Sequence, residues 1–284
     1  MATSTLLLVI VGYVALISLL AWLSNRGRTG SNADFYLASR QAPWYLVAFG
    51  MVGASLSGVT FISVPGDVGV PLAGGVKGMG YLQMALGYVA GYLVIAYVLL
   101  PLYYRLQLTS IYGYLGQRFG RQSERTGAAF FLLSRSLGSA VRLFLAVSVL
   151  QALVFDALGV PFALTALGCV LFVIFYTRRG GIRTVVLTDT LQTGVMIAAV
   201  VVSAALILQR LELQQPLRQL LASPWGTVFQ WDATRPDFFL KHFFAGMTIT
   251  IVMTGLDQDM MQKNLAVRSL REARKNMLVF NGVL

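Results

Sequence analysis

The sequence predicts an all-α protein that crosses a membrane several times. Of its 284 residues, 57% are hydrophobic and 12% are charged, and the mean hydropathy is +0.71. A soluble domain with that balance would expose too much apolar surface. Several apolar runs approach or exceed roughly 20 residues, the length a helix needs to cross a bilayer core of about 30 Å. Together these observations indicate a polytopic protein embedded in a lipid bilayer.

The apolar runs define the expected spans. The first is expected to be a retained helix and not a signal peptide, because Arg26 and Arg28 follow the run instead of preceding it. The segment 210–237 holds three prolines and two tryptophans, which predicts a folded loop at the membrane surface. An apolar segment from 275 onward is too short to cross, so we expect the chain to be the first part of something longer. The seven expected spans are 5–24, 44–66, 79–104, 127–155, 160–177, 184–209 and 238–262.

Basic residues predict the orientation of the spans. The chain has 22 Lys and Arg against 11 Asp and Glu. Such an excess can indicate nucleic-acid binding, but here the charges lie between apolar runs, where they act as topology signals. With the N-terminus outside, 15 basic residues fall inside and 5 outside. We therefore expect a multi-pass protein of the plasma (inner) membrane with its N-terminus outside and no nucleic-acid partner. The inside set is Arg26, Arg28, Arg40, Arg105, Arg118, Arg121, Arg125, Arg178, Arg179, Arg183, Lys263, Arg268, Arg271, Arg274 and Lys275, and the outside set is Lys77, Arg210, Arg218, Arg235 and Lys241.

Two basic stretches, Arg118–Arg125 and Arg268–Lys275, have acidic residues interspersed. Anchoring against anionic headgroups explains both without a catalytic role.

Residue usage also limits metal and redox chemistry. The one cysteine, Cys169, excludes an intramolecular disulfide and a cysteine-based metal cluster. The one histidine, His242, leaves no histidine pair for a haem, and we expect no organic cofactor.

The stretch GASLSGVTFISVPG, residues 53–66, carries helix-weakening residues at membrane depth. Gly53, Gly58 and Gly66 each weaken a helix by up to about 1 kcal/mol relative to alanine, and Pro65 removes a backbone donor. Freed carbonyls are tolerated in hydrocarbon only where they face protein or a wet cavity. One interpretation is a discontinuous helix whose unwound carbonyls coordinate Na⁺, as in secondary transporters. The alternative is that small residues allow close helix packing.

Five further polar residues near or within apolar spans are candidates for function. Arg142 lies mid-span, where a charge costs at least ~2.5–3.5 kcal/mol, and its guanidinium suits a carboxylate, either internal or on a substrate. Asp189 is a natural cation ligand, or an N-cap for the following helix. Gln83 suits either packing or substrate contact. Asp257 and Asp259 are expected to pair with the neighbouring basic loop.

Four stretches resemble, in order and spacing, the sodium:solute symporter family, which includes sodium-coupled glucose, proline, pantothenate and sialic acid carriers. The resemblance covers nearly the whole chain, Asp34–Lys275, and it is the combination of motifs that is specific. The stretches are ADFYLASRQAPWYLVAFGMVGASLSGVTFISVPG, LTSIYGYLGQRFG, YTRRGGIRTVVLTDTLQ and GLDQDMMQKNLAVRSLREARK.

The resemblance implies a five-helix inverted-repeat transporter fold preceded by an extra N-terminal helix. Residues 44–66 would be the broken helix of the first repeat. The family also takes Na⁺ ligands from a later helix of the second repeat, which this chain does not reach, so the 284 residues alone are not expected to transport. The implied parts of 1–284 are the extra helix (about 5–24), the first repeat (about 44–209), an outside loop (about 210–237) and the start of the second repeat (about 238–284).

The resemblance also implies site residues. The backbone carbonyls of Gly53 and Leu56 would contribute to the main Na⁺ site, and Asp189 falls where family members place a carboxylate linked to Na⁺ handling. Thr250 and Met253 stand where sugar carriers place an amide and an aromatic gate, which argues against a neutral sugar. The site pattern looks like that of the sialic acid carriers, whose substrate contacts would correspond to Ser55, Ser57, Thr60, Gln83 and Arg142, with the arginine holding the carboxylate.

Three functions follow as hypotheses. The first is Na⁺-coupled import of a small, anionic, carboxylate-bearing solute by alternating access. The second is a membrane sensor or receptor on a transporter scaffold, which binds solute without transport. The third is an intramembrane enzyme using Asp189 or Asp257, and it is disfavoured because neither residue has clustered His or Cys, or a Ser–base pair, near it in the sequence.

Overall fold

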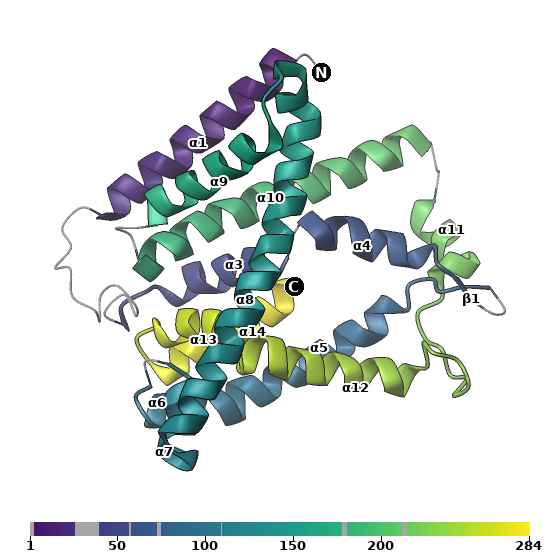
Figure 1. Cartoon of the computed structure of the whole chain (residues 1–284). Coiled ribbons are helices and arrows are strands. Elements are labelled where there is room, and N and C mark those ends of the chain that lie inside the picture. Colours follow the sequence, from purple (N-terminus) through teal and green to yellow (C-terminus); the bar gives the residue numbers. More distant parts are fainter. Residues whose placement is uncertain are drawn as a thin grey trace.

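The chain forms a bundle of α-helices in the computed structural model, which describes residues 3–25, 40–56, 58–72, 75–108, 110–177, 181–211 and 215–284 (Figure 1). Within these ranges, four helices are long and apolar enough to cross a membrane, and a bent pair of helices forms a possible fifth span. Two shorter apolar helices accompany them. The predicted all-α, multi-span class is confirmed.

The helices follow the expected spans closely, and the largest difference is the start of α8 at Arg121 instead of 127. Three segments are π-helical: Ile95–Leu99, Gln151–Phe155 and Ile251–Gly255. Two strands of two residues each, β1 (Pro71–Leu72) and β2 (Gly75–Val76), pair in antiparallel register. The helices are α1 (Thr3–Asn25), α3 (Trp44–Ser55), α4 (Gly58–Val68), α5 (Tyr81–Val94), α6 (Leu100–Arg105), α7 (Tyr112–Phe119), α8 (Arg121–Leu150), α9 (Phe162–Thr177), α10 (Gly181–Leu211), α11 (Pro216–Ala222), α12 (Phe239–Thr250), α13 (Gln258–Leu265) and α14 (Leu270–Val283).

The structure corrects the sequence analysis near the C-terminus. The seventh expected span is interrupted after Gly255, and α13 leaves at 65° to the helix before it. The last helix begins at Leu270 and not near 275, because the Ser269 hydroxyl accepts a hydrogen bond from the Glu272 amide at 3.3 Å and caps the helix. The short helix α7 was not anticipated.

Glycines bring α5 and α12 into close contact. Gly87 and Gly91 lie four residues apart on α5, the small-xxx-small spacing that lets membrane helices approach. A Cβ built on Gly87 would overlap the carbonyl of Phe243, and one on Gly246 would overlap that of Met84. Thr250 packs the same seam, 2.8 Å from a Cβ built on Gly91. These two helices are therefore held at backbone contact distance.

Helix α3 lies in the core against α10, α13 and α14. Its Met51 is fully buried, and the Met51 sulfur accepts from the side-chain amides of Asn264 and Asn276. Asn276 Nδ2 also donates to Asn264 Oδ1 at 2.6 Å. Buried polar groups need partners of this kind, so the amide pair joins α13 and α14 beneath α3. Figure 1 shows the C-terminal end of the chain at the middle of the bundle.

Candidate functional site

The first-repeat helix is broken, as one interpretation of its glycines predicted. Helix α3 ends at Ser55, Leu56 is extended (φ −81°, ψ 130°), and α4 begins at Gly58. The Leu56 amide still donates to the Val52 carbonyl at 2.8 Å. The carbonyls of the last turn of a helix have no partner within that helix. The break therefore leaves the backbone oxygens around Gly53 and Leu56 as candidate ligands.

The break between α3 and α4 lies beside the middle of the apolar part of α10. The Thr190 and Thr193 hydroxyls of α10 donate to the Leu46 and Phe49 carbonyls of α3, at 3.1 and 2.9 Å. Gly53 faces Thr193 across the same contact, so Leu56, three residues further along, faces about residue 196 of α10. The apolar part of α10 is Thr184–Leu211, so residue 196 is close to its centre.

Gly53 supports the packing interpretation as well. A Cβ built there would overlap the Thr193 hydroxyl and lie 3.0 Å from the Asp189 carbonyl. Gly50, one turn earlier, is similarly close to the Val186 carbonyl, at 3.1 Å. The small residues of α3 thus form the contact with α10, and the interruption of the helix follows them at Leu56. The packing interpretation thus holds at Gly50 and Gly53, and the predicted break is at Leu56. Coordination of Na⁺ by the freed carbonyls stays a prediction.

Asp189 lies within α10, so its interpretation as an N-cap is wrong. Its carboxylate accepts from the Lys263 ammonium group at 2.6 Å. The Lys263 side chain is 2% exposed and that of Asp189 is 17% exposed. Lys263 was assigned to an inside loop, but the turn of α13 after the broken span carries it under α10. A buried ion pair of this kind is strongly destabilised when one partner is removed.

Arg135 and Asp257 form a second long-range ion pair, which joins α8 to the break between α12 and α13. Asp257 also caps α13 by accepting from the Met260 amide at 3.1 Å. The expected pairing of Asp257 with the neighbouring basic loop is therefore wrong. Asp259 is exposed, and no pairing with that loop is seen for it.

Arg142 lies seven residues after Arg135 on α8 and is exposed. Residues seven apart share one helix face, so Arg142 and Arg135 point to the same side of the helix. No described residue forms an ion pair with Arg142. Arg142 is thus on the face of α8 whose Arg135 reaches the break between α12 and α13, and no contact places it beside the break between α3 and α4 in the described part of the chain.

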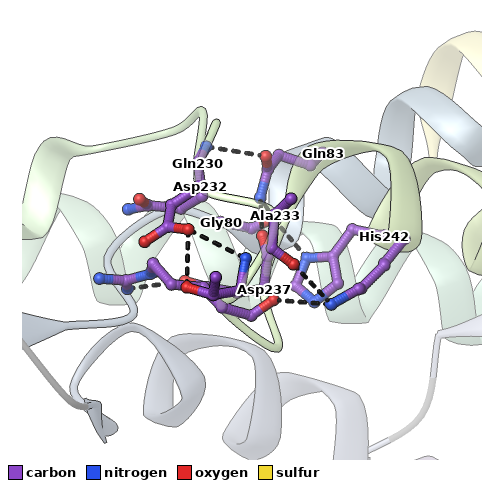
Figure 2. Close-up of polar contacts among 10 residues, drawn as sticks. Gly80, Gln83, Gln230, Asp232, Ala233, Asp237 and His242 are labelled. Carbon is purple, nitrogen blue, oxygen red and sulfur yellow. Dashed lines mark hydrogen bonds and ion pairs between the residues drawn. The ribbon is translucent and has the colours of Figure 1, made fainter.

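Gln83 is fully buried and both ends of its amide are engaged. Its Nε2 donates to the Asp237 carbonyl at 3.0 Å, and its Oε1 accepts from the Gln230 amide at 3.0 Å. Figure 2 shows Gln83 beside Gln230 and Asp237 of the loop before α12. Between packing and substrate contact, the geometry favours a packing role in which Gln83 anchors the loop before α12.

The same loop carries its own charge network (Figure 2). The Arg235 guanidinium donates twice to the Asp237 carboxylate, at 2.9 and 3.0 Å, and hydrogen bonding from Arg235 holds the pKa of Asp237 below its usual range. The Thr234 hydroxyl and amide lower the pKa of Asp232 in the same way. Lys241 donates to two loop carbonyls, at 3.0 and 3.2 Å. The loop is thereby folded onto the ends of α5 and α12.

The remaining candidate residues lie on the two sides of the break between α3 and α4. Ser55 is the last residue of α3, and Thr60 is in the first turn of α4; both are partly buried. Ser57 lies outside the described residues. Met253, one of the positions used to argue against a neutral sugar, is 59% exposed. Sequence reasoning did not identify Lys263, and its only signal was a charge beside the apolar end of the seventh span.

The donor set around the break suits a hard monovalent cation. In the part of the chain that is described, no three His, Cys, Asp or Glu side chains lie together to hold a metal ion. The oxygen groups along this side of α3 are the backbone carbonyls at Gly53 and Leu56, the Thr193 hydroxyl and, one turn earlier at Gly50, the side chain of Asp189. Oxygen atoms are the type of ligand that hard cations select.

The architecture defines a class of membrane protein. One interrupted helix, α3 with α4, follows α1, and another, α12 with α13, follows the loop that ends at Phe238. Paired interruptions at corresponding positions are typical of secondary transporters with inverted repeats. A sequence profile of the Sodium:solute symporter family matches residues 35–283. The chain belongs to the sodium:solute symporter family.

Known relatives agree with this assignment. The chain is 28% identical to a putative sodium-dependent multivitamin transporter of Drosophila melanogaster over 251 residues, 87% of this chain and 40% of the relative. It is 28% identical to the human sodium/iodide cotransporter, covering 89% and 38%. It is 27% identical to mouse sodium-coupled monocarboxylate transporter 1, covering 89% and 40%. The chain thus spans about two fifths of the length of these relatives.

A solved structure supports the fold. The substrate-bound, outward-open state of a Na⁺-coupled sialic acid symporter superposes with a TM-score of 0.73 and 20% sequence identity. The match covers 97% of this chain and 56% of the solved chain. At that identity the likeness establishes the fold, and the predicted inverted-repeat transporter architecture is confirmed.

Proposed function

We propose that this chain is the binding part of a Na⁺-coupled symporter that imports a small, carboxylate-bearing solute by alternating access. The observation that carries the proposal is the interruption between α3 and α4 at Leu56, three residues beyond Gly53, which packs against the Asp189 carbonyl. An unwound segment there can coordinate a cation and present helix ends to an anionic solute. The family supports Na⁺ as the coupling ion.

The proposed Na⁺ ligands are the carbonyls of Gly53 and Leu56 and the carboxylate of Asp189, with further ligands from outside this chain. Lys263 already neutralises Asp189 in this structure. Na⁺ would therefore have to take the carboxylate from an ammonium group. We infer that the Lys263 side chain moves when Na⁺ binds, which couples ion binding to α13.

The proposed solute site lies at the break between α3 and α4. Ser55, Ser57 and Thr60 supply hydroxyl groups on its two sides, and Arg142 supplies the charge for the solute carboxylate. An unpaired arginine on a membrane helix supports an anionic solute, because a bidentate carboxylate offsets its desolvation. Gln83 was grouped with these residues, but its two loop hydrogen bonds support an anchoring role instead.

The proposed orientation has the N-terminus outside and the basic loops on the cytoplasmic face of the plasma membrane. It rests on the distribution of basic residues between loops.

Ligand binding tests the proposal directly. The complete gene product, purified in detergent, is titrated with labelled sialic acid and with short monocarboxylates in NaCl and in KCl. We expect binding of at least one carboxylate in NaCl and a large loss in KCl. Equal binding in both salts would remove Na⁺ from the site, and binding of neutral sugars alone would remove the carboxylate.

A further inference from the structure

The connection between α7 and α8 forms an exposed basic corner, defined here by Arg118, Phe119, Arg121 and Arg125. Helix α7 ends at Phe119, Gly120 turns the chain with φ +89°, and α8 begins at Arg121. The three arginines are exposed, and the Phe119 side chain is 66% exposed. An aromatic ring and three positive charges thus lie together on the protein surface, where α7 meets α8.

The charges of the corner are not neutralised internally. Glu124, the acidic residue of this stretch, is turned against α7, where a Cβ built on Gly116 would overlap its carboxylate. No described residue forms an ion pair or hydrogen bond with the side chains of Arg118, Arg121 or Arg125. The corner therefore presents a net charge of three to its surroundings.

Several other basic residues expected on this side are used inside the protein. Arg274 donates to the Ala96 carbonyl at 3.2 Å and lies over the Tyr97 ring at 5.2 Å. Arg40 lies over the Tyr104 ring at 5.8 Å, and Lys263 is paired with Asp189. In the second basic stretch, Arg268–Lys275, the charge of Arg274 is thus used in contacts inside the protein. The middle of this stretch has no exposed aromatic ring.

The corner lies at the depth of the lipid headgroups. Helix α8 has 30 residues, which is about 45 Å of helix, and the hydrocarbon core is only about 30 Å thick. Its first residues, RQSERT, are polar or charged and precede the apolar run, so this is the end that extends beyond the hydrocarbon. Interfacial helices combine basic residues with an aromatic side chain that enters the boundary of the acyl chains.

We propose that this basic corner binds anionic phospholipid headgroups of the adjacent leaflet, with the three arginines on the phosphates and Phe119 in the acyl boundary. Guanidinium groups suit phosphate because they donate two parallel hydrogen bonds. The occupant is a lipid and not a free phosphate, because Phe119 needs an apolar partner. The proposal rests on membrane insertion and is independent of the transported solute.

The test compares two charge-matched variants of the complete gene product in detergent micelles. One is R118Q/R121Q/R125Q, and the control is R268Q/R271Q/K275Q, which removes the same charge from exposed positions nearby. Bound phosphatidylglycerol and phosphatidylcholine are counted by native mass spectrometry. Each arginine near an anionic surface contributes roughly fivefold in affinity. We expect the first variant to lose at least about tenfold in phosphatidylglycerol binding and the control to lose clearly less, because its stretch has no exposed aromatic ring to enter the acyl boundary.

A retained preference for phosphatidylglycerol in the first variant, or equal losses in both, would overturn the proposal. A second measurement covers the case in which the triple variant folds poorly. Phe119→Cys in a Cys169→Ser background is labelled with an environment-sensitive dye in nanodiscs. The proposal predicts an apolar emission spectrum with phosphatidylglycerol that shifts toward that of water when KCl is raised to about 1 M, where charges are screened within about 3 Å. A water-like spectrum throughout, or one that salt does not change, contradicts it.

Discussion

Arg142 is the residue on which the proposed class of solute depends. Among the residues that the structure describes, no carboxylate pairs with it, whereas Arg135, on the same helix face, is paired with Asp257. A charge that the protein itself leaves unpaired at membrane depth is costly unless a ligand offsets it. The same chain pairs Arg135 with Asp257, so the two arginines differ in what they contact although they are only two helical turns apart.

Replacing Arg142 tests this role. Arg142→Gln is expected to weaken binding of the carboxylate by at least about 30-fold, because losing one partner of a desolvated charge pair costs about 2–5 kcal/mol. Arg142→Lys keeps the charge but loses the bidentate geometry, so its loss should be smaller. Binding is measured by titration in NaCl, with Arg218→Gln on α11 as the control. Unchanged binding in Arg142→Gln would mean that the residue does not touch the solute.

Lys263 and Asp189 give a prediction about stability. Lys263→Met leaves a carboxylate unpaired in the core, which costs about 3–5 kcal/mol when one partner of a buried pair is removed. The double variant Asp189→Asn with Lys263→Met removes both charges and should recover part of that loss. Thermal unfolding of the two variants in detergent gives the comparison. If the double variant unfolds at the same temperature as the single one, the pair does not set the stability of this region.

At the scale of helices, hydropathy predicted the spans because each must cross the same apolar thickness. The interruption of α3 was predicted from its glycines and proline, yet the break is at Leu56, and Pro65 lies inside α4. The turn of α13 was missed, since a broken helix keeps its apolar composition. The ion pairs Lys263–Asp189 and Arg135–Asp257 could not be predicted from the sequence. Their partners are at least 74 positions apart, and helical periodicity relates only residues within one helix.

The contact between α5 and α12 predicts how glycines there respond to substitution. Gly87→Ala places a methyl group on the Phe243 carbonyl and should destabilise the protein by about 1–3 kcal/mol, the usual cost of overpacking. Gly138→Ala on α8 is the matched control, because a Cβ built there meets nothing within 4 Å, and alanine favours the helix by up to about 1 kcal/mol. Both are compared by thermal unfolding in detergent. Equal effects would contradict the close approach.

The loop before α12 predicts a response to pH. The pKa of Asp237 is lowered by the hydrogen bonds from Arg235, so the folded loop favours the ionised carboxyl group. Its contribution to stability is present above the ordinary carboxyl pKa of about 3.9 and is lost as pH falls through the lowered pKa. We expect the protection factors of the Gln230 and Phe239 amides, the ratios of intrinsic to observed exchange rates at each pH, to fall below about pH 4. In Asp237→Asn this pH dependence should be much weaker, and an identical profile in the variant would assign it elsewhere.

At the scale of the whole molecule, α13 contacts four other helices: α10, α8, α6 and α3. It is tied to α10 by Lys263 and to α8 through Asp257, and the Tyr104 hydroxyl of α6 lies 2.9 Å from the Asn264 carbonyl. Just beyond α13, the Ala266 carbonyl accepts from the Ala42 amide ahead of α3 at 3.1 Å. A single short helix therefore holds one end of the bundle together. If Na⁺ takes Asp189 from Lys263, the proposed ion site acts on this junction.

The central claim is Na⁺-driven uptake of a carboxylate, and accumulation in proteoliposomes tests it most directly. The complete gene product is reconstituted, and entry of labelled sialic acid and of a labelled monocarboxylate is followed with an inward Na⁺ gradient and with equal Na⁺ on both sides. The account predicts accumulation above the outside concentration only with the gradient, and its loss in Arg142→Gln. Na⁺-dependent binding without any accumulation would contradict transport and favour a receptor on a transporter scaffold.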